Sequence, residues 1–451
     1  MNGHEKDGAT PVVAPGDTQV KTLGTCRITP PVRLRGGDFG SEPQYVDDHE
    51  RVLVSDELGQ IQTSHQPLEM QPCFEMAGPR RKIYFDPSKT RAGIVTCGGL
   101  CPGLNDVIRG LVLSLHFIYG IKHVYGFKNG YAGFVPKYGY DVLDLDPELV
   151  SEINERGGTI LGSSRGNQDP VEIVDCLERM SISVLFVIGG DGTIRGAIAI
   201  NKEIEKRGLK IAVVGVPKTI DNDILFIDQS FGFASAYSAA THVIRAAHQE
   251  AKGAHNGVGL VKLMGRHSGF IACYASLAMS DVNFVLIPEV PIVLDGPRGF
   301  LSILKNRLER RKHAVIVVAE GAGQELIGEA ERGRDASGNL RLADIGEFLR
   351  DKISAHFKPI DFECNLKYID PSYIIRSVPA IPADSVFCLR LAHAAVHAAM
   401  AGRTEVIIGS WHGRFVHVPM PLAIRNRQIV EPNGDLYLSV LESTGQPRAW
   451  Q

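Results

Sequence analysis

The run Val-Leu-Phe-Val-Ile-Gly-Gly-Asp-Gly-Thr, at residues 184–193, decides the predicted fold of this chain. A similar run follows it, in which the apolar residues 211–216 lead into Pro-Lys-Thr-Ile-Asp-Asn-Asp at residues 217–223. Each run is typical of a buried β-strand that ends in a tight polar turn. Open α/β sheets place ligand chemistry at the carboxyl ends of their strands, so we expect ligand chemistry at both turns.

The same order of strand, glycine turn and helix occurs earlier in the chain. Ile94 and Val95 precede the glycine turn 97–103, and Asn105 can cap the helix that follows. Further strands are predicted at 258–261, 284–287, 314–318, 405–408 and 414–418, and further helices at 231–251, 269–278, 297–310 and 387–401. Because strands alternate with helices, the sequence predicts an α/β protein with mainly parallel sheets in two Rossmann-like lobes.

Residues 1–88 differ in composition from the rest of the chain. They are rich in Pro, Gly, Asp, Glu and Gln and contain only short apolar patches. We expect an N-terminal extension that is disordered at first and then packs on the body or on a neighbouring subunit.

Composition excludes several classes of partner. With 451 residues and a formal net charge of −3, the chain has no overall charge that would attract nucleic acid or an anionic membrane. No apolar run is long enough to span a bilayer, and the start of the chain does not resemble a targeting segment. Its eight cysteines are scattered. We therefore expect a cytoplasmic protein that acts on a small molecule.

Three of the predicted turns suit phosphate. Glycines at 189–193 let a phosphate chain approach backbone N–H groups, and the following helix directs its positive end at the anion. Asp191 is then the natural magnesium ligand. The turn 97–103 is also rich in glycine, and the turn 162–166 carries Arg165, whose planar fork can bridge phosphate oxygens. The alternative is that these glycines serve only the geometry of strand-to-helix turns.

The turn 217–223 adds the groups that phosphoryl transfer to an alcohol requires. Asp221 and Asp223 lie beside the hydroxyl of Thr219 and the ammonium of Lys218. One carboxylate can act as the base for the attacking hydroxyl. A solvated turn at the surface is the alternative. Two later strand ends contribute Arg266, suited to a substrate phosphate, and Glu320, suited to sugar hydroxyls.

From about residue 82 to residue 430 the chain resembles the 6-phosphofructokinases. The ordered motifs that carry the resemblance are residues 96–105 (Thr-Cys-Gly-Gly-Leu-Cys-Pro-Gly-Leu-Asn), 161–165 (Leu-Gly-Ser-Ser-Arg), 189–193, 217–223, 264–266 (Met-Gly-Arg), 319–321 (Ala-Glu-Gly) and 373–376 (Tyr-Ile-Ile-Arg). Residues 261–266 and 369–376 are most similar to the long, ATP-dependent plant and protist-type subgroup.

The resemblance implies a role for each matching residue. Asp221 would deprotonate the 1-hydroxyl of the sugar, with Arg165 and Thr219 as the other catalytic residues, and Asp191 would bind magnesium. The residues implied to hold the nucleotide are Gly98, Arg165, Gly166, Gly190, Asp191, Gly192 and Thr193. Those implied to hold fructose 6-phosphate are Thr219, Ile220, Asp221, Met264, Gly265, Arg266, Glu320, Tyr373 and Arg376.

The implied reaction is phosphoryl transfer from MgATP to D-fructose 6-phosphate, giving fructose 1,6-bisphosphate and ADP in glycolysis. Pyrophosphate-dependent relatives have Asp in place of Gly192, and its carboxylate would repel the α-phosphate of ATP, so Gly192 favours ATP. Lys218 is the residue that the pyrophosphate users carry, so a pyrophosphate donor stays open. A catalytically silent regulatory subunit is a further alternative, against which Asp191, Asp221 and Arg165 argue.

The resemblance also implies a domain organisation. We expect an extension at 1–88, a nucleotide-binding lobe at 89–225 completed by 390–430, a sugar-phosphate-binding lobe at 226–389, and a tail at 431–451. The family further implies an allosteric homotetramer, with the extension against a neighbouring subunit.

Overall fold

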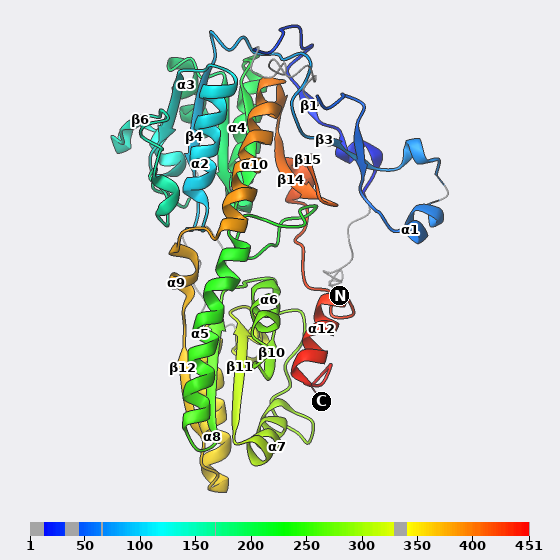
Figure 1. Ribbon diagram of the computed structural model, residues 1–451, viewed down its shortest axis with the longest axis vertical. Helices are drawn as coiled ribbons and strands as arrows, with labels where there is room; N and C mark the ends of the chain where they lie inside the picture. The colour runs from blue at the N-terminus through cyan, green and yellow to red at the C-terminus, as the bar shows by residue number, and fades with distance from the viewer. Residues whose placement is uncertain (1–12, 32–44, 65, 167, 329–340, 451) are drawn as a thin grey trace.

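The computed structural model describes residues 13–31, 45–64, 66–166, 168–328 and 341–450, which form a larger and a smaller lobe (Figure 1). Of the predicted extension, residues 1–12, 32–44 and 65 lie outside this description. Each lobe is built on its own sheet with helices packed on it, and the sheets have nine and four strands. The predicted α/β class with mainly parallel sheets is confirmed.

The nine-stranded sheet of the larger lobe has a parallel centre and antiparallel edges. Strands β14, β8, β7, β4 and β5 run parallel to one another, and β15, β3, β2 and β6 are antiparallel to their neighbours. In spatial order the strands are β2 (Arg51–Leu53), β3 (Cys73–Met76), β15 (Arg414–Pro419), β14 (Val406–Trp411), β8 (Ala212–Pro217), β7 (Val184–Gly189), β4 (Arg91–Thr96), β5 (His123–Phe127) and β6 (Val142–Asp144).

Helices cover both faces of this sheet. Phe186 and Ile188 of β7 face a core shared with α2 (Leu104–Leu113) and α10 (Pro382–Met400). The alternate residues Leu185 and Val187 face α3 (Pro170–Arg179) and α4 (Asp191–Lys206). Because successive strand residues point to opposite faces, both sets must be apolar, which explains the continuous apolar run at 184–188.

The smaller sheet is parallel throughout. Its order is β10 (Phe284–Leu286), β11 (His313–Ala319), β9 (Gly257–Leu263) and β12 (Asn365–Ile369). The helices that follow these strands or precede them are α5 (Phe233–Gly253), α6 (Phe270–Ala278), α7 (Phe300–Arg311), α8 (Ile345–Phe357) and α9 (Ser372–Ser377). The long helix α5 runs along this lobe from the junction with the larger one (Figure 1).

Segments near both ends of the described chain pack against elements that are distant from them in sequence. β1 (Lys21–Thr22) pairs with β13 (Arg403–Thr404), and β3 extends the larger sheet beside β15; the short helix α1 (Leu58–Thr63) precedes β3. After α11 (Met420–Ala423) in the larger lobe, the chain crosses to the smaller lobe, where α12 (Asp435–Thr444) contacts α6 and β10 (Figure 1). No helix within the described residues is long and apolar enough to cross a membrane.

Candidate active site

A cavity of about 820 Å³ lies where the turns that follow the parallel strands of the two sheets meet. The turns after β4, β7 and β8 supply its wall on the larger lobe, and those after β9 and β11 supply its wall on the smaller lobe. The sequence-predicted residues that line it are Gly98, Arg165, Gly166, Gly190, Asp191, Gly192, Thr193, Thr219, Ile220, Asp221, Met264, Arg266, Glu320 and Arg376. Motifs spread over more than 200 residues of sequence are thus brought to one site.

The turn after β7 presents the first residues of α4 to this cavity. The Tyr131 hydroxyl donates to the Thr193 carbonyl over 2.7 Å and fixes the first turn of the helix. A Cβ atom on Gly192 would meet no atom within 4 Å. Because free backbone N–H groups and the helix dipole gather at a helix N-terminus, this end of the cavity suits an anion.

Cationic side chains gather around the glycine turn after β4. A Cβ atom on Gly99 would lie 3.4 Å from the Arg165 guanidinium and 3.6 Å from that of Arg376. Beneath the turn, the buried Lys218 ammonium donates to the Gly99 carbonyl, and burial lowers the pKa of Lys218. These cations can offset the charge of several phosphate groups.

The turn after β8 holds Asp221 at both ends of its backbone. Its N–H donates to the Thr219 hydroxyl over 3.1 Å, and the Ser268 hydroxyl donates to its carbonyl over 3.0 Å. Oδ1 of Asp221 is buried and accepts no hydrogen bond from the described residues. Burial, followed by the charges of Asp223 and Glu320, raises the pKa of Asp221 well above the usual range for aspartate. Asp221 thus lines the cavity with a side-chain oxygen whose hydrogen-bonding capacity is unused.

The smaller lobe supplies Met264, Arg266 and Glu320. The loop after β9 and the loop after β11 lie so close together that a Cβ atom on Gly321 would be 2.0 Å from the Arg266 carbonyl oxygen, so only glycine fits there. Burial raises the pKa of Glu320, and the nearby charges of Arg266 and Lys262 act in the opposite direction. Glu320 and Arg266 therefore place a hydrogen-bond acceptor and a cationic donor on this wall.

Two predicted substrate residues do not line the cavity. Gly265 contributes backbone only, and its carbonyl accepts the Gly321 N–H over 3.0 Å. Tyr373, on α9, is 77% exposed, and the Arg376 guanidinium lies 4.7 Å from its ring centroid. Among the described residues, Tyr373 is connected to the site through its contact with Arg376.

Sequence reasoning missed Arg427. Its guanidinium pairs with Asp191 over 2.7 Å and also with Asp223, and it lines the cavity. No motif surrounds this residue, because its place depends on the crossing of the chain between lobes. Only the three-dimensional arrangement brings it to the site.

The carboxylates at this end of the cavity fit a magnesium ion. Among the described residues no group of three or more His, Cys, Asp or Glu side chains forms a metal cage. Magnesium in nucleotide sites uses one or two carboxylates and completes its shell with water and phosphate oxygens. Asp191 and Asp223, already paired with one cationic group, supply that donor set.

A model of the phosphofructokinase family matches residues 91–399. The chain belongs to this family. Among curated members, the ATP-dependent 6-phosphofructokinase of Amycolatopsis methanolica is 53% identical over 96% of this chain and 95% of its own length. The enzyme of the same name from Borreliella burgdorferi is 54% identical over 96% of this chain and 97% of its own length. The family fold is shared with the pyrophosphate-dependent phosphofructokinase of Marinobacter aquaeolei, whose structure matches with a TM-score of 0.65 and 19% identity over 80% of this chain and 92% of that one.

Proposed function

We propose that the protein transfers the γ-phosphoryl group of ATP to the 1-hydroxyl of fructose 6-phosphate, giving fructose 1,6-bisphosphate and ADP. Family membership and the two relatives named for this activity support the proposal. The observation that carries it is the buried carboxylate of Asp221, which faces a cavity with glycine turns and a helix N-terminus on one wall and Arg266 with Glu320 on the other.

Asp221 would act as the general base. The 1-hydroxyl oxygen of the sugar forms a bond to the γ-phosphorus, the bond from that phosphorus to the β,γ-bridging oxygen breaks, and the hydroxyl proton passes to the Asp221 carboxylate. A raised pKa suits this task because a base whose pKa lies closer to neutral accepts a proton more readily. Its two backbone hydrogen bonds, with Thr219 and Ser268, hold the carboxylate in place.

The cationic residues divide between the two substrates. Arg165, with the amides of Gly98, Gly166, Gly190, Gly192 and Thr193, would hold the nucleotide phosphates and offset charge on the transferring group. Arg266 and Arg376 would bind the 6-phosphate, while Glu320, Met264 and Ile220 would contact the sugar. Tyr373 would contribute by stacking on Arg376.

Asp191, with Asp223 beside it, would hold the magnesium ion of the nucleotide complex. When bound, this ion neutralises phosphate charge and orients the phosphate chain.

A pyrophosphate donor is the second candidate, because Lys218 lines the same cavity. Its ammonium is engaged by the Gly99 carbonyl. At Gly192 the open space beyond the Cα atom leaves room for a donor that is bulkier than pyrophosphate. We therefore favour ATP.

The Asp221→Ser variant tests the proposed base. It should lower kcat by about 10²-fold or more, since that is the usual contribution of a general base. Asp175→Ser, at an exposed carboxylate on α3, is the matched control and should keep full activity. Near-normal turnover of the Asp221 variant with fructose 6-phosphate would refute the assignment.

We propose a nucleotide-binding lobe of 89–225 completed by 390–430, a sugar-phosphate-binding lobe of 226–389, the extension 1–88 and the tail 431–451. A cytoplasmic, allosterically regulated homotetramer in glycolysis is proposed from the family alone.

A further inference from the structure

The segment between α11 and α12 lines the cavity through Arg427, and hydrogen bonds hold its backbone at two points. The Gln428 N–H donates to the Asp223 carbonyl over 3.0 Å. The Val430 N–H donates to Oε1 of Glu289 over 2.8 Å, and the same oxygen accepts the N–H of Gly269 at the start of α6 over 2.9 Å. The backbone that follows Arg427 is therefore tied to Asp223, which lines the cavity, and to Glu289 of the smaller lobe.

The Arg427 side chain joins two carboxylates that come from different strand ends. Nη2 lies 2.7 Å from Oδ2 of Asp191, after β7, and Nη1 contacts Oδ2 of Asp223, after β8. The carboxylate side chains are only 18% and 6% exposed. Two buried like charges repel each other strongly unless a cation lies between them, and the guanidinium fills that role here.

We propose that Arg427 is an internal counter-cation, which holds Asp191 while no nucleotide is bound and yields it to the divalent cation that arrives with the nucleotide. The proposal rests on the proposed role of Asp191 as metal ligand. An oxygen that is ion-paired with a guanidinium over 2.7 Å, as Oδ2 of Asp191 is, is a poor ligand for a divalent ion, because the two cations repel each other. The Gln428 N–H donates to the Asp223 carbonyl over 3.0 Å, and this bond keeps the backbone beside Arg427 at the site when the guanidinium yields Asp191.

This arrangement has a consequence for the order of binding. The two carboxylates and the Arg427 guanidinium together carry the net charge of one anion. A free divalent ion therefore gains little electrostatic energy by entering the empty site. The phosphates of a nucleotide bring additional negative charge, which makes the exchange favourable. The empty enzyme should therefore bind divalent cations weakly at this site.

The test is a titration of nucleotide-free protein with Mn²⁺, followed by electron paramagnetic resonance of the free ion. Wild-type protein should show no tight site at Asp191. Arg427→Met should gain one Mn²⁺ site per chain with a Kd lower than that of wild type by about tenfold or more, since a neighbouring positive charge has been removed from a largely buried pair. Arg427→Gln should gain the same site, and it replaces Arg427→Met in the titration if that variant does not fold.

Two further variants give the controls. Arg425→Met removes an arginine of the same segment that pairs with Asp17 over 2.9 Å, away from the cavity, and should gain no site. Arg427→Met combined with Asp191→Asn should lose the gained site. The proposal is overturned if neither Arg427 variant binds Mn²⁺ more tightly than wild type, or if the gained site survives Asp191→Asn. Because this titration needs no substrate or turnover, it can fail or succeed separately from the proposed kinase activity.

Discussion

At the scale of single residues, the chemistry depends on how Asp221 is surrounded. Burial removes water from its carboxylate, and Asp223 and Glu320 add negative charge nearby. These influences raise the pKa of Asp221, and a hydrogen bond from the Arg266 backbone together with the charge of Arg427 opposes them. The carboxylate is thereby kept a better proton acceptor than an exposed aspartate.

The pH profile of the reaction should report this environment. A base acts only when it is ionised, so a raised pKa places the acidic limb of kcat at a higher pH than an ordinary aspartate would. Asp223→Asn removes one of the charges that raise the pKa and keeps an oxygen for the Thr219 hydroxyl, so it should move this limb to lower pH. Asp175→Asn should leave the limb unchanged. A limb that stays in place in the Asp223 variant would show that another group controls it.

Sequence reasoning recovers residues that lie in motifs and misses residues placed by topology. Asp191 and Asp221 directly follow apolar strands, so the rule for strand ends locates both. Arg427 follows no strand and lies in no glycine turn. Its position follows from an antiparallel bridge between residue 427 and Ile224, which joins segments about 200 residues apart. Only long-range pairing places it, and a single sequence carries no direct signal of that pairing.

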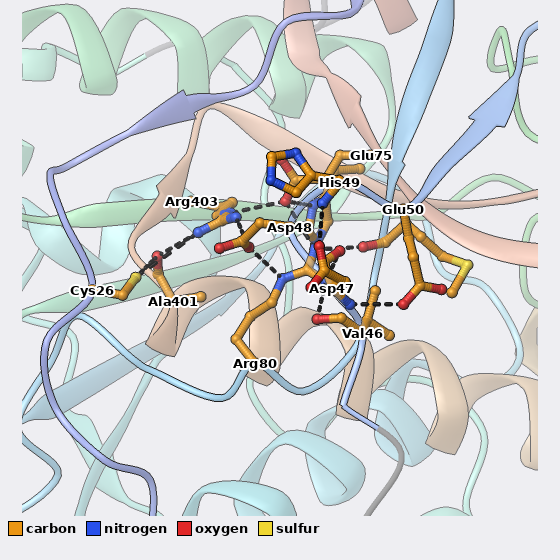
Figure 2. Close-up of polar contacts among 12 residues, drawn as sticks. Cys26, Val46, Asp47, Asp48, His49, Glu50, Glu75, Arg80, Ala401 and Arg403 are labelled. Atoms are coloured by element: carbon orange, nitrogen blue, oxygen red, sulfur yellow. Dashed lines mark hydrogen bonds and ion pairs between the residues drawn. The ribbon is translucent and has the colours of Figure 1, made fainter.

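At the scale of elements, a buried ionic cluster fastens the N-terminal strands to the larger sheet (Figure 2). Oε1 of Glu75, on β3, accepts hydrogen bonds from Arg80 and from Arg403 of β13, each over 2.9 Å. The His417 ring, on β15, lies 3.1 Å from the same oxygen, and Arg403 also pairs with Asp48 over 2.8 Å. Burial alone would raise the pKa of Glu75, but His417, Arg403 and Arg80 outweigh it and hold that pKa well below the usual range.

Glu75→Gln should lower the free energy of unfolding by about 3 kcal/mol, because it removes the buried counter-charge of two buried arginines and leaves them only the exposed Asp48. Urea denaturation at neutral pH measures this change. Glu50→Gln, at an exposed carboxylate of the same N-terminal segment, should change it by about 0.5 kcal/mol or less. Equal losses in the two variants would contradict a role for the cluster.

The sign of the pH dependence follows from the direction of the Glu75 shift. A depressed pKa in the folded state contributes stability above the unfolded carboxyl pKa, and that stability is lost as the pH falls through the folded value. The wild-type protein should therefore lose part of its stability below about pH 4.5. Glu75→Gln should flatten this part of the stability curve.

Elements with strong apolar periodicity were predictable, and short or half-exposed ones were not. The apolar sequences that form β7 and β8 are fully buried and contain no polar residue. Strand β12 lies beside β9 at the edge of its sheet, and its five residues are exposed or half-buried. The strands β2 and β3 have only three and four residues, which is too short for a clear alternating pattern. Whether such short strands form is determined by tertiary contacts and not by the local sequence pattern.

At the scale of the whole molecule, the two lobes meet at a junction (Figure 1), and the turns that follow the parallel strands of both sheets line one cavity there. The larger lobe brings the glycine turns and Asp191, and the smaller lobe brings Arg266 and Glu320. Asp221 follows β8 at their junction, where its backbone contacts Ser268 of the smaller lobe. This division matches a reaction in which a donor and an acceptor, bound on opposite walls, meet at one base.

The identity of the phosphoryl donor tests the account most directly. Purified full-length protein with Mg²⁺ and fructose 6-phosphate should be given ATP or pyrophosphate in parallel, with products followed by phosphorus NMR. We predict fructose 1,6-bisphosphate and ADP in equal amounts with ATP, and a rate with pyrophosphate lower by about tenfold or more. A faster reaction with pyrophosphate, or no phosphorylation of the sugar by ATP, would contradict the proposed function.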